Sequence, residues 1–171
     1  LCEVNDHHFK RLKGTDKWTE YIPEHEHTTL PATDSDPLYL YLIHENQGPG
    51  EPRHWSLFLA RENQQGWVYQ VTGDAEFMTY EPSAEMVDAT STEEFYSAYQ
   101  LATVTEDQVV VIKQVCESEA PLSAPNRRLV RDNCQGWAVR VVARLVGEGV
   151  VGESKLRMMR GMVEPVGGGI L

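Results

Sequence analysis

Cys134 has the sequence context of a reactive cysteine. It follows Asp132 and Asn133, which are residue types that cap helix N-termini, and it opens the segment 134–147, whose apolar residues repeat at the spacing of one helical face. The first turn of a helix favours a thiolate, because unpaired backbone N–H groups and the helix dipole attract negative charge there. Cys134 is therefore a candidate nucleophile. The alternative is a small buried residue on the core face of the helix.

His54 is the candidate base for this cysteine. It begins the strand-like segment 54–60 directly after a loop rich in glycine and proline. Gln70 lies in the next strand-like segment, 67–71. If the hairpin loop near 62–66 has an odd number of residues, positions of the same parity share a face. Gln70 would then lie beside His54 and hold its imidazole in one tautomer, whereas an even loop would place Gln70 on the opposite face.

Strand-like segments dominate the middle of the chain. Each is rich in aromatic and β-branched residues and bounded by turn signals, and they span residues 38–43, 54–60, 67–71 and 76–80. Because the connections between them are short, we expect these four strands to follow one another as an antiparallel meander. Residues 97–104 have the pattern of a fifth strand.

Helical patterns follow the strands. Thr105 and Gln108 form a capping box that predicts a helix over 105–117, although the VVVI run inside it also suits a strand. The segment 134–147 has the clearest helical pattern, and glycines end it. A shorter helix is expected over 153–162. The sequence therefore predicts an α+β fold: an antiparallel sheet of four to six strands, with the cysteine-bearing helix packed on one face.

The charges are distributed unevenly along the chain. Residues 1–125 carry 7 basic and 22 acidic side chains, whereas residues 126–160 carry 8 basic and 3 acidic ones. One interpretation is that the basic segment pairs with the acidic remainder. The other is that Arg127, Arg128 and Arg131 set the electrostatic field around Cys134.

Composition excludes several classes of protein. The formal net charge of −11 disfavours a nucleic-acid binder, which needs a basic face, and no apolar run is long enough to span a membrane. Three scattered cysteines do not make a disulfide framework, and none forms a CxxC pair. We therefore expect a cytoplasmic protein with neither a metal nor another cofactor.

Three short motifs resemble those of permuted NlpC-type papain-like proteins, and most of all their lecithin retinol acyltransferase branch. The motifs are HWSLFL, GWVYQV and NCQGWA, and the similarity covers roughly residues 38–147. In that family the histidine precedes the cysteine along the chain, the reverse of ordinary papain. The resemblance implies that Cys134 is the nucleophile, His54 the base and Gln70 the third, polar member of the site.

Two departures from that branch concern the substrate. Gln70 stands where the branch usually has a second histidine, and Gln-Gly-Trp follows Cys134 where the branch has Glu-His-Phe. No long apolar anchor follows either, so a lipid substrate does not carry over. With this resemblance the chain divides into an N-terminal extension (1–35), a permuted papain-like domain (36–152) and a C-terminal helix and tail (153–171).

The expected chemistry is acyl transfer through a thioester. An amide, ester or thioester of a small molecule or peptide would be hydrolysed, or its acyl group transferred. Two alternatives remain open: a catalytically inactive binding or scaffold protein on the same fold, and a small-molecule tailoring enzyme that uses the pocket without a covalent intermediate. The sequence does not indicate an oligomeric state.

Overall fold

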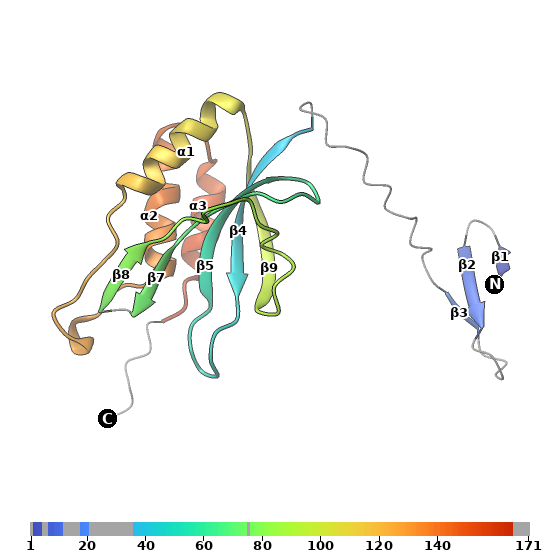
Figure 1. Ribbon diagram of the computed structural model, residues 1–171, viewed down its shortest axis with the longest axis horizontal. Helices are drawn as coiled ribbons and strands as arrows, with labels where there is room; N and C mark the ends of the chain where they lie inside the picture. Colours follow the sequence, from blue (N-terminus) through green and yellow to red (C-terminus); the bar gives the residue numbers. More distant parts are fainter. Residues whose placement is uncertain (1, 5–6, 12–17, 21–35, 75, 166–171) are drawn as a thin grey trace. The chain divides into compact units, whose positions relative to one another are not determined.

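The computed structural model describes residues 2–4, 7–11, 18–20, 36–74 and 76–165, and the chain divides into two compact units (Figure 1). The first unit, Leu1–Ser35, contains strands β1 (Cys2–Val4), β2 (His7–Arg11) and β3 (Trp18–Glu20). They pair antiparallel in the order β1-β2-β3. These strands were not expected from the sequence. The second unit, Asp36–Leu171, carries all the candidate site residues.

A four-stranded antiparallel sheet forms the centre of the second unit. Its strands are β4 (Leu38–Glu45), β5 (His54–Arg61), β6 (Trp67–Tyr69) and β9 (Phe95–Val104), in the order β6-β5-β4-β9. The expected α+β class and antiparallel sheet are confirmed. The expected meander holds for β4, β5 and β6, which pair in chain order, and is wrong for the fourth predicted strand, 76–80, which lies in a separate sheet. Strand β9 pairs with β4, and its alternating burial suits an edge strand with one face on the core.

The segment predicted as one strand over 67–71 is instead broken at Gln70. Strand β6 ends at Tyr69, and β7 (Val71–Asp74) pairs only with β8 (Phe77–Tyr80), in a separate two-stranded sheet. The break has a backbone cause, because the carbonyl of Gln70 accepts a hydrogen bond from the amide of Glu81 at 2.9 Å instead of continuing the ladder with β5. Gln70 therefore lies between the end of β6 and the start of β7.

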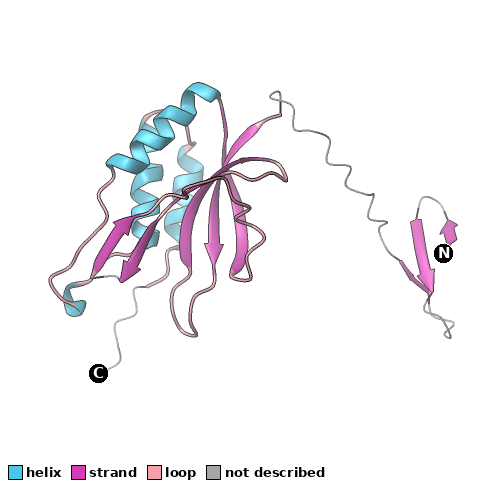
Figure 2. Cartoon of the chain, viewed as in Figure 1, coloured by secondary structure: helices cyan, strands magenta, loops and turns pink. Residues whose placement is uncertain are grey.

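Three helices pack on one face of this sheet: α1 (Glu106–Ser118), α2 (Cys134–Gly147) and α3 (Glu153–Met162), with a 3-10 turn, η1, at Arg127–Leu129 (Figure 2). The Thr105 side chain accepts from the Gln108 amide and the Gln108 side chain accepts from the Thr105 amide, so the capping box is present and the strand interpretation of this segment is wrong. The predicted helices over 134–147 and 153–162 are confirmed.

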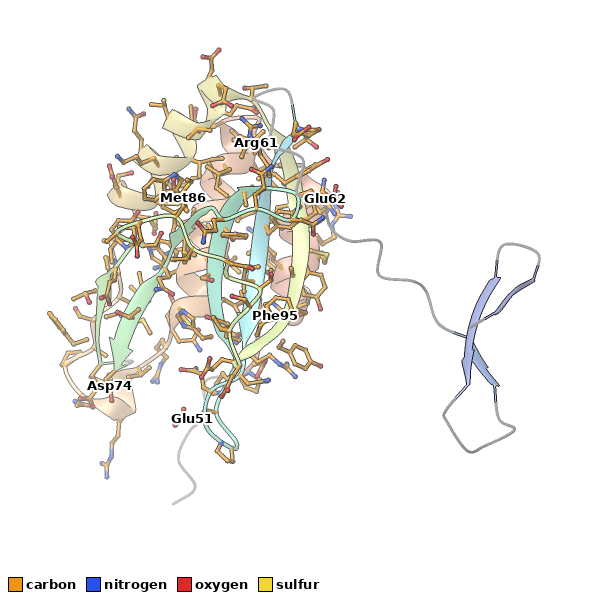
Figure 3. The ribbon with its side chains drawn as sticks, turned by 45° about the vertical axis from the view of Figure 1, so that its right-hand side comes forward. Glu51, Arg61, Glu62, Asp74, Met86 and Phe95 are labelled. Atoms are coloured by element: carbon orange, nitrogen blue, oxygen red, sulfur yellow. The ribbon has the colours of Figure 1, made fainter. Side chains whose placement is uncertain are left out.

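Helix α2 anchors the main core. Trp137 and Val141 are fully buried and belong to the same cluster as Trp55 and Leu57 of β5, so the cysteine-bearing helix packs on the sheet as predicted. A smaller cluster around Ile43 lies on the opposite face. Figure 3 shows that face, with the segment bearing Met86 crossing in front of the sheet. Among the described residues, no helix is long and apolar enough to cross a membrane.

Candidate active site

His54 and Gln70 meet at one end of the sheet. The loop 62–66 has an odd number of residues, and the register pairs Leu57 with Tyr69, so positions of the same parity face the same side. Nε2 of His54 lies 2.9 Å from Oε1 of Gln70, which confirms the expected contact. Because an amide oxygen only accepts, Nε2 is the protonated nitrogen in this pair. This leaves Nδ1 as the nitrogen available to a second partner.

Cys134 is the first residue of α2, and Asn133 caps that helix. The Asn133 side chain accepts from the amides of Gln135 and Gly136, at 3.0 and 3.4 Å. The backbone amide of Trp137 donates to the Asn133 carbonyl. Among the described hydrogen bonds, these leave the amide of Cys134 as the first-turn donor without a partner. The thiol therefore lies beside an unused N–H group at the positive end of the helix dipole.

The side chains of Cys134 and His54 interact. Burial by itself would lower the pKa of His54, but a hydrogen bond with Cys134 and the charge of its thiolate outweigh burial, and the hydrogen bond with Gln70 adds to them. The net effect is a His54 pKa above its ordinary value of 6.5. The structure thus brings together the three residues selected from the sequence.

Cys134 itself is only 4% exposed and belongs to the main hydrophobic cluster. Access to its sulfur is therefore narrow. A cavity of about 310 Å³ lies elsewhere, and its lining includes Phe58, Arg61 and Glu62. Figure 3 places Arg61 and Glu62 toward one end of the sheet and Glu51 and Phe95 toward the other. His54, opposite Glu45 in the register, belongs to the latter end, so this cavity is not the space beside Cys134.

Glu45 is a site residue that the sequence analysis missed. It is the last residue of β4 and lies directly opposite His54 in the antiparallel register. Its charge contributes to raising the pKa of His54, and its Oε1 atom lies 3.4 Å from the Thr92 hydroxyl. The sequence signal was a carboxylate that ends the strand before the one His54 begins. Only the register across the loop 46–53 shows that the two residues are neighbours.

Gln135 and Glu164 were also missed. The side chain of Gln135 is fully buried, and its Nε2 atom donates to the carbonyl oxygen of Arg53 at 2.9 Å. Its Oε1 atom accepts from the backbone amide of Glu164 at 2.7 Å. The carboxylate of Glu164 in turn pairs with the Arg53 guanidinium at 3.0 Å. In the sequence, Gln135 was noted only as a departure from the resembling family's motif.

The arginines near Cys134 have other partners. On α2, Arg140 pairs with Asp132 and with Glu119 at 2.7 Å, and Arg144 pairs with Glu119 at 3.2 Å. Arg131 is exposed and donates to the carbonyls of Arg128 and Val130. Arg128 is also exposed, and the Arg127 side chain lies outside the described part of the structure. Arg140 thus connects the residues before α2 with the end of α1, and Arg144 connects the last turn of α2 with the end of α1.

Gly136 lies next to this ion-pair network. A Cβ atom at this position would lie 1.4 Å from Oδ1 of Asp132, the carboxylate that pairs with Arg140. The space beside the backbone is therefore occupied by the Asp132 side chain. A side chain at position 136, where the resembling branch has histidine, would have to displace Asp132 from this place.

The fold and the site define the class of this protein. It is an α+β domain with a cysteine at the start of a helix and a histidine at the start of a strand. The chain belongs to DUF6540, a family of unknown function whose model matches residues 40–152, about two thirds of the sequence. The matched range contains His54, Gln70 and Cys134 and ends before Glu164. No curated protein and no solved structure matches the chain.

Proposed function

We propose that this protein is a cysteine-dependent hydrolase or acyltransferase that acts on an amide, ester or thioester of a small molecule or peptide. The observation that carries the proposal is the hydrogen bond at 2.9 Å that holds Nε2 of His54 on Gln70, beside a cysteine that is the largest influence raising the pKa of His54. A cysteine paired with a histidine that is oriented by a third polar group is the arrangement that nucleophilic catalysis requires. The similarity to permuted NlpC-type papain-like proteins, in which histidine precedes cysteine, supports the same assignment.

The geometry suggests a role for each group. The Cys134 thiolate attacks the carbonyl carbon of the substrate, and the carbonyl oxygen becomes an oxyanion that the unused amide of Cys134 would stabilise. His54, protonated by the thiol, then gives its proton to the leaving amine, alcohol or thiol as the carbon–heteroatom bond breaks. A water molecule or an amine, deprotonated by His54, attacks the resulting thioester and releases the thiolate of Cys134.

The test is capture of the acyl-enzyme. The whole protein is incubated with p-nitrophenyl acetate and analysed by peptide mass spectrometry, beside Cys134→Ser and His54→Asn. We expect acetylation of Cys134 in the wild type, its loss in Cys134→Ser and a slower reaction in His54→Asn. Acetylation only at residues other than Cys134, or an acetylation rate that is unchanged in His54→Asn, would contradict the proposal.

A binding protein without turnover is the second candidate. The 4% exposure of Cys134 favours it, because a nucleophile must be reached by its substrate. The two candidates differ in the acylation experiment, since a binding protein retains the fold but does not accumulate a thioester on Cys134.

A further inference from the structure

We propose that Gln135 and Glu164 are positioning residues, and that the segment after α3 completes the catalytic site by fixing His54 against Cys134. This inference rests on the proposed function. We call Arg53, Gln135 and Glu164 the clamp. Each of these three residues contacts the other two. The fully buried side chain of Gln135 makes two of the contacts, and an ion pair at 3.0 Å between Arg53 and Glu164 makes the third.

Two of the clamp residues are sequence neighbours of His54 and Cys134. Arg53 immediately precedes His54, and Gln135 immediately follows Cys134. The hydrogen bond from Gln135 Nε2 to the Arg53 carbonyl therefore joins the two backbones one residue away from the base and one from the nucleophile. A displacement of either backbone changes the separation of the reacting side chains directly. Catalytic groups must be held to within about 0.5 Å of their working geometry.

Glu164 makes three hydrogen bonds within the clamp. Its amide donates to Gln135, while its carboxylate accepts from both the backbone amide and the guanidinium of Arg53, at 3.3 and 3.0 Å. The same guanidinium lies 3.9 Å above the ring of Tyr96 at the start of β9. Strand β5, helix α2 and the segment after α3 are thus connected through Glu164 at the site.

The buried amide of Gln135 has a role besides packing. A fully buried amide side chain is costly unless both its donor and its acceptor are satisfied. Packing at this position needs only an apolar residue of similar volume. Gln135 instead donates to one segment and accepts from another, and both partners lie within a few residues of the site or of α3. A link between two backbones explains this residue, whereas packing alone does not.

The experiment measures two properties of the whole chain. The first is the rate at which iodoacetamide alkylates Cys134 near neutral pH, with buried Cys116 as the internal reference. The second is the titration midpoint of His54, followed by NMR. The variants are Glu164→Ala, Glu164→Gln and Gln135→Met. The matched control is Glu106→Ala, which removes the ion pair between Glu106 and Arg61 at the other end of β5.

Glu164→Ala removes the contacts of the carboxylate with Arg53, and Gln135→Met removes both hydrogen bonds of the buried amide. In either variant we expect the alkylation rate of Cys134 to fall about tenfold to a hundredfold. The His54 midpoint should fall as its contact with Cys134 loosens. Glu164→Gln, which can still accept from Arg53, should lie between Glu164→Ala and the wild type, whereas a pure charge effect would make the two Glu164 variants equal. Glu106→Ala should change neither property.

Wild-type values of both properties in folded Glu164→Ala would overturn the role of the Glu164 carboxylate, and wild-type values in folded Gln135→Met would overturn the role of Gln135. Either result would leave the proposed function standing. If Gln135→Met does not fold, the two Glu164 variants decide whether the contacts of the segment after α3 with Arg53 position His54. If wild-type Cys134 alkylates no faster than Cys116, the proposed function fails. The His54 midpoint then still decides whether Glu164 positions the histidine, because that readout does not require turnover.

Discussion

Glu45 and His54 face each other across the β4–β5 ladder, the last residue of one strand opposite the first residue of the next. This pairing supplies what Gln70 does not. Gln70 orients the imidazole through a hydrogen bond but carries no charge, whereas the carboxylate of Glu45 favours the protonated ring electrostatically. His54 is therefore oriented by the residue that follows β6, and the end of β4 adds a negative charge to the larger influence of Cys134 on its pKa.

Replacing Glu45 with Gln should lower the pKa of His54, because the substitution removes a nearby negative charge and little volume. An NMR titration of the His54 ring in both proteins measures the change. Glu51→Gln is the matched control, since Glu51 is an exposed residue of the β4–β5 loop. A His54 midpoint that moves equally in both variants would reveal an effect of net charge alone.

The two described free cysteines should differ in reactivity. Cys116 is fully buried, and burial together with the charge of Glu117 raises the pKa of its thiol to about 12. We expect iodoacetamide to modify Cys134 at least about tenfold faster than Cys116 in the native protein, since only the thiolate reacts. Peptide mass spectrometry over a time course gives both rates. Equal rates would make Cys134 an ordinary core residue.

Gln70→Ala should reduce acylation of Cys134 about tenfold to a hundredfold, because the imidazole loses the partner that fixes its orientation. The free energy of unfolding should change by only about 1 kcal/mol, the value of one hydrogen bond. Gln70→His restores the residue type that the resembling branch usually has, and it should retain more activity than Gln70→Ala. If the alanine variant acylates normally, Gln70 is not part of the site.

Acid should destabilise the protein through His44. This residue is 4% exposed and stacks on Trp55 at 4.7 Å, and burial followed by the charge of Arg53 lowers its pKa to about 4. Between pH 6.5 and 4 the unfolded chain therefore binds a proton that the folded chain does not. Stability should fall as the pH falls through this window, by up to about 3 kcal/mol.

Chemical denaturation between pH 7 and 4, for the wild type and His44→Phe, measures this contribution. Phenylalanine keeps an aromatic ring against Trp55 and has no titratable group. The wild type should lose more stability than the variant over this range. Identical pH profiles would mean that other groups cause the acid sensitivity.

Gly66→Ala should destabilise the fold by about 1–3 kcal/mol. A Cβ atom there would lie 2.2 Å from the carbonyl oxygen of Leu59, inside the hairpin whose register places Gln70 beside His54. Gly147→Ala is the matched control, because a Cβ atom at the end of α2 meets nothing within 4 Å. Thermal unfolding of both variants should therefore show a loss for Gly66→Ala alone.

Patterns local in sequence were the ones that predicted structure correctly. The capping box at Thr105 and Gln108 and the helix that starts at Cys134 depend on neighbours within a turn, and both were found from the sequence. The odd loop 62–66 was the condition for placing Gln70 beside His54, and the structure meets it. Nothing local indicated that β9 pairs with β4, because strand order depends on contacts distant in sequence.

The missed site residues have the same explanation. Glu45 joins the site through a strand register, and Glu164 through hydrogen bonds to residues 29 and 111 positions away. Gln135 was visible in the sequence, but its partners were not. A buried glutamine indicates that two polar partners exist, but the sequence does not show which backbone groups these partners are.

The placement of β9 beside β4 also has a consequence for synthesis of the chain on the ribosome. As the protein emerges from its N-terminus, β4, β5 and β6 can pair while the other edge of β4 is still open, and the unpaired edge is a surface prone to pairing with other chains. His54 emerges early and Cys134 much later, and Glu164 follows α3. His54 is therefore synthesised well before Cys134, so the proposed acyl transfer requires that most of the domain has left the ribosome and folded.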